Sequence, residues 1–554
     1  LVAREINTHK RPDLFAATPP LESLRSVLSI LASNQGNEQA KDNFILMSND
    51  IKRAYFYAPV QRPLFITIPV EDREEGDEGM VGKLNLSLYG TRDAAQNWAA
   101  TYTKHLLEIG FEAGKASPCN FVHAERGIST TIHGDDYTSV GREGDLRWMD
   151  GKLKEAFETK TKYLGPDPSK GHDKEVKILN RVLTWGQNGI TYEADQRHGE
   201  LIVKDLGLET AKGVTTPGTR EDVKKADQEN EDDGQECSGK DATFYRGICA
   251  RLNYLAQDRY DLLYASKEAS RRMSKPRQGD WTLLKRIGRY LRHAPRLIQE
   301  FNWQTMPPCV DVHIDSDWAG CATTCKSTSG GAISLGCHAT KAWSSTQATI
   351  ALSSGEAELY ALVKGAGQAL GMVALMEDLG YSLDARVHSD SSAAIGISNR
   401  KGLGKLRHLN VQFLWVQDKI KDKSLSLHKV PGERNPADLM TKHLDMGTAN
   451  KHLARLGFVR NEGRATVAPE LSSIMAAVVS DAARARPWKD LTPSRAGPEG
   501  FGKLEGLSCI GRARAAGTNQ EGVVPGAKDI ALDGLREPPH EKDARHGHQD
   551  APPD

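Results

Sequence analysis

Two adjacent aspartates, Asp135 and Asp136, stand between two apolar segments of the chain. Residues 130–140 read TTIHGDDYTSV, so a glycine precedes the two acids and β-branched residues lie on both sides. Glycine and aspartate favour tight turns, and the pattern therefore predicts a β-hairpin with two carboxylates at its tip. Adjacent carboxylates repel each other and are stabilised by a divalent cation; the alternative is an ordinary solvated turn.

A third acid, Asp50, ends another apolar segment. Residues 44–60 read FILMSNDIKRAYFYAPV, which predicts a strand that carries Asp50 at its end, followed by a turn and Ala54-Tyr55. The chain therefore offers three carboxylates at the ends of predicted strands.

A second group of acids lies in the carboxy-terminal half. Residues 310–315 alternate apolar and polar side chains, so Asp315 ends a predicted strand on the face away from the core. Residues 353–356 have the form of a helix capping box, which would engage Glu356 at the start of its own helix. Asp438 follows Asn435 and Pro436, where the helix dipole alone would also favour a carboxylate.

The composition gives no general attraction for a polyanion. The 554 residues include 73 basic and 73 acidic side chains, so nucleic acid would have to be bound by local basic surfaces. Eight cysteines form no disulfide framework, and we find neither a signal-peptide core nor an apolar run of about 18 residues. We expect an intracellular protein that is not secreted and has no membrane partner. An amino end without Met is interpreted as part of a longer product.

Composition and periodicity also predict the organisation of the chain. The charged stretch 221–236 is interpreted as a linker, and Met306-Pro307-Pro308 as a boundary before a new domain. Apolar periodicity predicts helices over residues 281–293 and 354–379, and the pattern fades from about Thr448. The Gly-, Pro- and Ala-rich end is expected to be disordered.

Several short motifs occur in an order that is specific to one family. They are LVARE at the start, DIKRAYFYA, SLYGTRDAAQNW, IHGDD, FYRGICARLNYLAQDRYDLLYA, WTLLKRIGRYLRH, ALSSGEAELYAL, HSDSSAAI and NPADLMTKHL. Residues 1 to about 445 resemble the reverse transcriptase and ribonuclease H region of copia-type LTR retrotransposon Pol polyproteins.

The resemblance implies an α+β polymerase palm and fingers with a thumb or connection, then an α/β ribonuclease H-like domain and a disordered carboxy-terminal tail. The corresponding ranges are 1–210 for the fingers and palm, which begin inside the fingers, 211–308 for a linker with thumb- or connection-like helices, 309–446 for the ribonuclease H-like domain, and 447–554 for the tail.

The resemblance assigns roles in DNA synthesis to the first group of acids. Asp50 and Asp135 match the principal metal ligands and Asp136 the supporting carboxylate. Tyr55 matches the aromatic gate that excludes a 2′ hydroxyl, although a corner Tyr in the core would look the same. Arg4 matches a contact to the incoming triphosphate and Gly90 a position near the template base pair.

In the ribonuclease H-like part, Asp315, Asp390 and Asp438 match three metal ligands. The fourth is Glu356 or Glu358, and we favour Glu358 because the capping box would engage Glu356. Each site is expected to bind two Mg²⁺, with Mn²⁺ as a substitute. The basic helix 281–293 could contact a phosphate backbone or be a solvated face, and its candidate residues are Lys285, Arg286, Arg289 and Arg292.

The expected function is RNA-directed DNA polymerase with ribonuclease H activity, with an RNA template, a DNA primer, an RNA/DNA hybrid and dNTPs as partners, in a cytoplasmic particle or the nucleus. No protease or integrase motif is found in these residues. His133-Gly134 before the acids, and Asp93 and Ala95 where the family has Gln and Pro, depart from the usual motifs. We therefore expect weak or no polymerisation by the fragment alone. The alternatives are a ribonuclease H with a decayed polymerase half, or a degenerate or domesticated nucleic-acid-binding protein.

Overall fold

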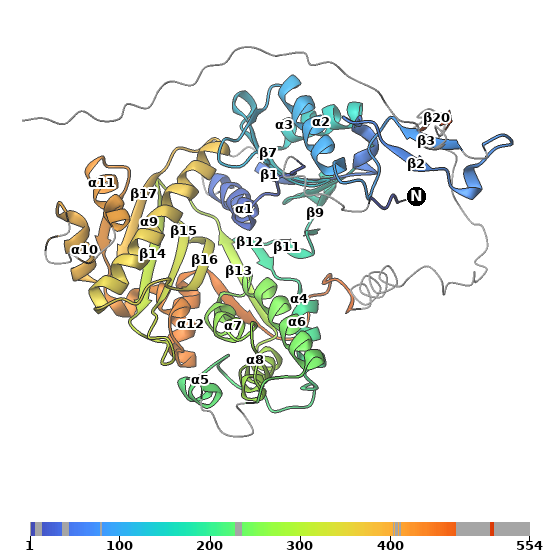
Figure 1. Cartoon of the computed structure of the whole chain (residues 1–554). Helices are drawn as coiled ribbons and strands as arrows, with labels where there is room; N and C mark the ends of the chain where they lie inside the picture. The colour runs from blue at the N-terminus through green and yellow to red at the C-terminus, as the bar shows by residue number, and fades with distance from the viewer. Residues whose placement is uncertain are drawn as a thin grey trace, which may run out of the picture.

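The computed structural model describes residues 2–5, 14–35, 44–77, 80–227, 235–402, 404, 408, 411–471 and 510–514. Helices surround three larger β-sheets and one small one (Figure 1). The α-helices are α1 (Leu21–Gln35), α2 (Ala94–Glu108), α3 (Glu143–Ala156), α4 (Gln196–Asp205), α5 (Arg220–Asp227), α6 (Gly239–Ala256), α7 (Leu263–Ser270), α8 (Trp281–His293), α9 (Ser354–Asp378), α10 (Ser392–Asn399), α11 (Trp415–Lys421) and α12 (Met446–Arg455). The 3-10 helices are η1 (Ala54–Tyr57), η2 (Val70–Asp72), η3 (Ala124–Arg126), η4 (Pro168–Lys170), η5 (Tyr260–Leu262), η6 (Gln278–Asp280), η7 (Val411–Leu414), η8 (Gly432–Arg434) and η9 (Pro436–Met440).

The amino-terminal sheet contains the hairpin predicted from the first group of acids. Its spatial order is β4 (Glu112–Ala113), β5 (Asn120–His123), β6 (Ile128–His133), β7 (Asp136–Arg142), β1 (Phe44–Ile51), β8 (Thr159–Leu164) and β9 (His172–Asp173). The turn of the β6–β7 hairpin is Gly134-Asp135, and Gly134 has a φ of +67°. Glycine reaches that left-handed region without the steric penalty of a side chain, which explains the residue before the acids.

The two faces of this sheet carry different side chains. Ile45, Met47 and Tyr137 pack with residues of α2 and α3. The alternate residues Leu46 and Val140 pack with α1. Because side chains alternate along a strand, the residues in register with these, including Asp50 and Asp136, face the α1 side.

The middle sheet joins segments that are far apart in sequence. Its order is β10 (Glu175–Ile178), β11 (Arg181–Trp185), β12 (Gly189–Glu193), β13 (Arg296–Asn302) and β19 (Phe458–Asn461). Strands from three of the four predicted ranges, 1–210, 211–308 and 447–554, therefore hydrogen-bond in one sheet. Such long-range pairing leaves no local mark in the sequence.

The carboxy-terminal sheet begins where the sequence predicts a new domain. Its order is β16 (His338–Thr346), β15 (Thr328–Leu335), β14 (Cys309–Asp317), β17 (Asp384–Ser389) and β18 (Ser426–Lys429), and β14 is parallel to β17. The predicted strand at 310–315 and the predicted helices at 281–293 and 354–379 are all found. Helix α9 covers one face, where Gly365 lies close to Ile314.

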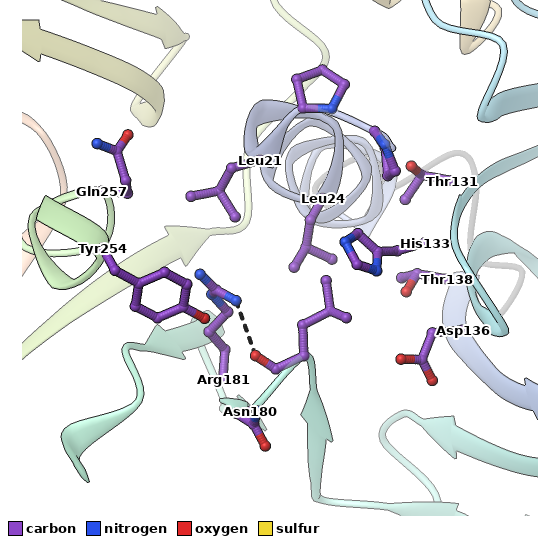
Figure 2. Close-up of a pocket in the computed structure, with 13 residues that line it drawn as sticks. Leu21, Leu24, Thr131, His133, Asp136, Thr138, Asn180, Arg181, Tyr254 and Gln257 are labelled. Atoms are coloured by element: carbon purple, nitrogen blue, oxygen red, sulfur yellow. Dashed lines mark hydrogen bonds between the residues drawn. The ribbon is translucent and has the colours of Figure 1, made fainter. Parts of the chain in front are cut away.

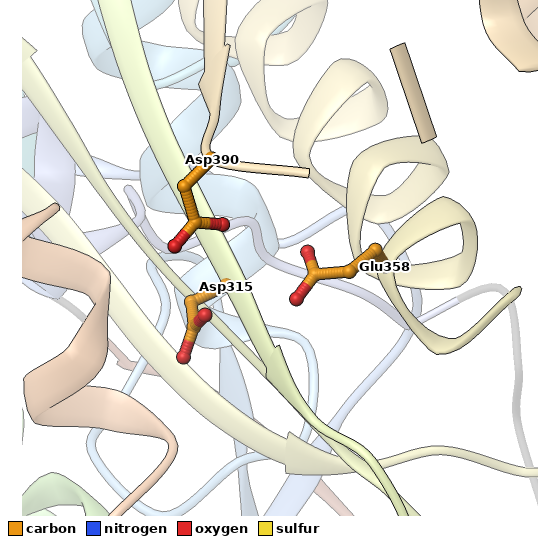
Figure 3. A group of neighbouring side chains, drawn as sticks. All are labelled: Asp315, Glu358 and Asp390. Carbon is orange, nitrogen blue, oxygen red and sulfur yellow. The ribbon is translucent and has the colours of Figure 1, made fainter. Parts of the chain in front are cut away.

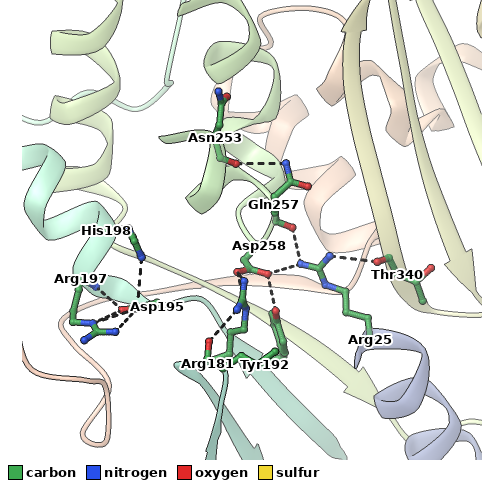
Figure 4. Close-up of polar contacts among 11 residues, drawn as sticks. Arg25, Arg181, Tyr192, Asp195, Arg197, His198, Asn253, Gln257, Asp258 and Thr340 are labelled. Atoms are coloured by element: carbon green, nitrogen blue, oxygen red, sulfur yellow. Dashed lines mark hydrogen bonds and ion pairs between the residues drawn. The ribbon is translucent and has the colours of Figure 1, made fainter. Parts of the chain in front are cut away.

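Helix α1 lies between the amino-terminal sheet and the carboxy-terminal sheet (Figure 1). Residues 23–33 are all buried, and they include Arg25 and four serines. Arg25 donates hydrogen bonds to Asp258, to the Gln257 carbonyl and to the Thr340 carbonyl, a network shown in Figure 4. Helix α1 itself contacts strands of all three larger sheets, namely β1, β6, β7, β12, β13 and β16, so these sheets meet at one buried helix.

Two expectations, one about the linker at 221–236 and one about the carboxy-terminal tail, differ from the structure. Residues 221–227 of the expected linker belong to α5, whose Asp222 pairs with Arg286, while 228–234 lie outside the described residues. The expected tail begins too early, because α12 and β19 bury Leu453 and Phe458 against the core. The small fourth sheet joins β2 (Phe65–Thr67), β3 (Met80–Leu84) and β20 (Ile510–Arg514). The rest of the expected tail, 472–509 and 515–554, lies outside the described residues.

Among the described helices, α9 is the one that is long and apolar enough, by length and composition, to cross a membrane. Half of its most apolar window is buried within the structure. A core helix that packs on a sheet has the same composition, and α9 packs on β14, β15 and β17.

Candidate active sites

The three acids of the first group lie at one end of the amino-terminal sheet. Asp50 on β1 is directly opposite Asp136 on β7, and the Ile51 amide donates to the Asp135 carbonyl over 3.1 Å. Burial, followed by the charges of Asp135 and Asp50, raises the pKa of Asp136 to about 6. The negative charges are therefore close enough to repel each other, which a cation at this end of the sheet would relieve.

Tyr55 lies beside these acids and packs against a second tyrosine in a tilted arrangement. Its ring centroid is 4.5 Å from that of Tyr89. Burial, followed by the charge of Asp135, raises the pKa of both hydroxyls. Tyr55 is half-buried, so its position next to Asp135 is compatible with the gate role that the resemblance implies.

Asp136 also forms part of a cavity of about 440 Å³ (Figure 2). The cavity lies between the hairpin residues Thr131, His133 and Thr138, the start of α1, and Arg181 and Tyr254. Leu21 and Leu24 contribute apolar walls. Elements of the middle sheet and α6 therefore face Asp136 across this cavity.

Gly90 lies against the segment 2–5 that contains Arg4, but the two residues have different surroundings. Gly90 has a φ of +95°, and a Cβ there would lie 1.8 Å from the Ala3 carbonyl oxygen. The structure thus explains the glycine by its backbone conformation and by the close approach of residues 2–5. Arg4 is exposed beside it, so its contact to a triphosphate stays a prediction.

Asp93, one of the departures, and the nearby Trp98 both have structural roles in this region. Asp93 is buried at the start of α2 and pairs with Arg62 over 3.0 Å. Trp98 is buried in the core and donates to the Gly134 carbonyl over 2.8 Å, which fixes the turn that carries Asp135.

The second group contains a more compact set of carboxylates. Asp315 on β14, Glu358 on α9 and Asp390 just after β17 each offer an oxygen within 4.8 Å of the others (Figure 3). Burial, then the charges of Asp315 and Asp390, raise the pKa of Glu358 to about 8. Burial also raises the pKa of Asp315 and of Asp390.

At the start of α9, the side chains of Glu356 and Glu358 have different partners. Ser353 caps α9 and accepts a hydrogen bond from the Glu356 amide. The Glu356 carboxylate accepts from the Leu352 amide and the Tyr360 hydroxyl, and it lies 3.0 Å from His408 Nε2. Glu356 is thus engaged at the end of its own helix, whereas Glu358 points to Asp315 and Asp390.

Asp438 lies near this set but is held by a lysine. Asn435 caps η9 and Pro436 starts it, as the sequence predicts, although the helix is of the 3-10 type. Lys442 Nζ is 2.8 Å from Asp438 Oδ1 and 3.5 Å from Asp315 Oδ2. After burial, the charge of Asp438 also raises the pKa of Asp315 and Asp390, so the fourth acid interacts electrostatically with two of the three.

The donor set fits a hard divalent cation. All of the converging ligand atoms are carboxylate oxygens, which Mg²⁺ and Mn²⁺ prefer. Glu358 Oε2 is buried without a hydrogen-bond partner, a costly state that a bound cation would relieve.

The lysine and arginine side chains of α8 are of two kinds. Two of them form an ion pair or a hydrogen bond within the structure, and two are exposed. Arg286 pairs with Asp222 over 3.2 Å, and Arg289 donates to the Lys212 carbonyl over 2.8 Å. These two arginines hold the segment 212–222 against α8, whereas Lys285 and Arg292 are exposed. Nucleic-acid binding by this helix stays a prediction, and Lys285 and Arg292 are its better candidates.

Sequence reasoning missed Lys442 and Thr441, which both contact Asp315. The available signal was their spacing of three and four residues from Asp438, which places all of them on neighbouring turns.

Residues 8–218 match the family described as "Reverse transcriptase (RNA-dependent DNA polymerase)". This range includes Asp50, Asp135 and Asp136 together with the whole hairpin. The segment is thus a member of the reverse transcriptase family.

The wider chain is similar to curated Pol polyproteins. It is 24% identical to the retrovirus-related Pol polyprotein from transposon TNT 1-94 of Nicotiana tabacum, over 78% of this chain and 31% of the relative. It is 24% identical to that from transposon RE1 of Arabidopsis thaliana, over 83% of this chain and 30% of the relative. Over most of its length the chain is thus similar to retrotransposon Pol polyproteins, and it spans about a third of the length of these relatives.

Solved structures give a weaker similarity. The foamy viral protease-reverse transcriptase in complex with dsDNA aligns with 70% of this chain and 68% of its own, at 11% identity and a TM-score of 0.16. A score of this size does not support an inference about the fold.

Proposed function

We propose that this chain copies RNA into DNA at Asp50, Asp135 and Asp136, and cleaves the RNA of the resulting hybrid at Asp315, Glu358, Asp390 and Asp438. The observation that carries the nuclease half is the convergence of three carboxylates, two buried and one half-buried, within 4.8 Å. The polymerase half is supported by the reverse transcriptase family match over residues 8–218.

Each acid group would hold divalent cations, for which Mg²⁺ is the proposed physiological ion. When bound, such ions activate the attacking oxygen and neutralise charge on the phosphate. The chain's own residues fix the ligands: β1 and β7 hold Asp50 and Asp136 in register, and the cap of α9 orients Glu358 toward Asp315. Tyr55 next to Asp135 would exclude a 2′ hydroxyl, so that the product is DNA.

A second candidate function is a ribonuclease H whose polymerase half is inactive. Two observations favour it. Among the described residues, the first acid group does not converge as closely as the second, and Asp136 faces a cavity of about 440 Å³ that α1 and Tyr254 help to enclose. A third possibility, a protein that only binds nucleic acid, has no specific observation in its favour.

Two assays with crossed variants test the proposal. Incorporation of dNTPs on an RNA template should be lost in Asp135→Asn and retained in Asp390→Asn. Cleavage of a labelled RNA/DNA hybrid should show the opposite pattern. Cleavage without incorporation would support the nuclease alone, and cleavage that is indifferent to Asp390→Asn would overturn the nuclease assignment.

A further inference from the structure

A lysine stands between the three converging carboxylates and the fourth acid. Lys442 follows η9, and its ammonium contacts Asp438 Oδ1 over 2.8 Å and Asp315 Oδ2 over 3.5 Å. Its side chain is 34% exposed, so it reaches the acids from the solvent side. Asp438 is not among the carboxylates that converge within 4.8 Å, and its Oδ1 is instead paired with this ammonium.

Lys442 compensates charge that the cluster cannot otherwise balance. Buried carboxylates at this separation repel each other strongly. Among the ion pairs of the described residues, those of Lys442 are the ones that reach the carboxylates of this group. Lys429 is also nearby, but it donates to the Asp390 backbone carbonyl and to Ser392 Oγ.

The place of the ammonium is also the place where a cation shared by Asp315 and Asp438 would bind. An ammonium and a divalent ion compete for the same carboxylate oxygens. Lysine can vacate such a position, since its four-carbon stem is flexible and its charged end is attracted to phosphate.

We propose that Lys442 is a positioning residue that occupies the second cation position of the nuclease site until nucleic acid arrives. Without substrate, Asp315, Glu358 and Asp390 bind one divalent ion while Lys442 holds Asp438. When an RNA phosphate attracts the ammonium, Asp438 is released and a second ion binds. This inference rests on the proposed nuclease function of the same acids.

Binding of Mn²⁺ to the full chain without nucleic acid tests this order of events. Lys442→Gln should bind one more Mn²⁺ than the unmodified protein, as measured by calorimetry. The first ion should bind about tenfold more tightly because one positive charge is lost. Electron paramagnetic resonance should show a coupled Mn²⁺ pair, as expected for ions about 4 Å apart, in excess of any pair signal of the unmodified protein.

Three further variants make the result specific. Lys442→Arg keeps a cation and should bind no additional ion. Asp438→Asn in the Lys442→Gln background should remove the additional ion. Lys419→Gln removes the same charge from a lysine on α11 that pairs with Asp422, and it should change neither the number of bound ions nor their affinity.

An unchanged stoichiometry in Lys442→Gln, or an additional ion that persists after Asp438→Asn, would overturn the inference. Failure of this inference can be distinguished from failure of the proposed nuclease function. Hybrid cleavage that depends on Asp390 without a gained ion rejects only the role of Lys442. A gained ion in a protein that cleaves no hybrid rejects the nuclease function.

Discussion

The Arg25 guanidinium of α1 lies 2.7 Å from the Asp258 carboxylate, and both side chains are buried. The same carboxylate accepts from Arg181 and from the Tyr192 hydroxyl, so one negative charge compensates two buried cations. We expect Asp258→Asn to cost about 3–5 kcal/mol of unfolding free energy, because it leaves two guanidinium groups without a counter-charge. Arg25→Met should cost less, about 1–3 kcal/mol, because a neutral Arg181–Asp258 pair remains.

Urea denaturation of both variants measures this asymmetry. Lys104→Met is the matched control, because Lys104 pairs with Glu108 at the surface over 3.9 Å, and its loss should cost less than about 1 kcal/mol. Equal costs for Asp258→Asn and Arg25→Met would contradict the charge argument.

Asp378 at the end of α9 links this helix, which packs on the carboxy-terminal sheet, to the loop between β4 and β5 of the amino-terminal sheet. Its carboxylate accepts hydrogen bonds from three consecutive amides, those of Lys115, Ala116 and Ser117, over 2.7, 3.1 and 2.7 Å. Asp378→Ala leaves these amides without their acceptor, so we expect a loss of about 1–3 kcal/mol and faster hydrogen exchange at residues 115–117.

Two further variants test this prediction: one should reproduce the effect, and the other should not. Gly114→Ala should have a similar effect, because a Cβ there would lie 2.5 Å from the Asp378 carboxylate. Glu377→Gln changes an exposed neighbour and should leave the exchange rates unchanged. Protection that survives in Asp378→Ala would show that other contacts hold this loop.

His338 makes the contact between α1 and the carboxy-terminal sheet sensitive to acid. It lies 2.9 Å from Ser29 Oγ and 2.8 Å from the Asn302 carbonyl, and burial lowers its pKa to about 4. The unfolded chain therefore takes up this proton first as the pH falls. The stability that the neutral ring contributes is present above pH 6.5 and is lost progressively down to about pH 4.

Melting temperatures between pH 7 and pH 4.5 measure this loss. His338→Gln should be less stable at pH 7 but should lose less on acidification, with a difference of up to about 3 kcal/mol across the window. His293→Gln removes an exposed histidine as a control. Parallel pH profiles for His338→Gln and the unmodified protein would contradict the prediction.

The sequence predicts well whatever depends on neighbouring residues. The bounds of α8, the strand β14, the hairpin at Asp135 and the caps at Ser353 and Asn435 all follow from local periodicity, turn preference or side-chain caps. These features need no knowledge of distant contacts. The same local reasoning separates Glu356 from Glu358.

What depends on distant contacts could not be predicted. Helix α1 has no amphipathic pattern to find, because Ser23, Ser26, Ser29 and Arg25 are buried together with its leucines. The pairing of β13 with β19 joins residues that are more than 150 positions apart, and neither strand marks its partner. The contact of Lys442 with Asp315 likewise exists only because η9 packs on β14.

The two glutamates at the start of α9 give opposite predictions for the same chemical change. Glu358→Gln removes a converging oxygen, so we expect Mn²⁺ binding at the carboxylate cluster to weaken at least about tenfold and hybrid cleavage to be lost. Glu356→Gln should leave metal binding within about twofold, but it should lower stability by about 1 kcal/mol because the contacts to Leu352 and His408 are weakened. Calorimetric metal titration and thermal unfolding of both variants separate the two effects. Loss of metal binding in Glu356→Gln with retention in Glu358→Gln would reverse the assignment, because it would show that the helix start, and not the residue two positions later, supplies the ligand.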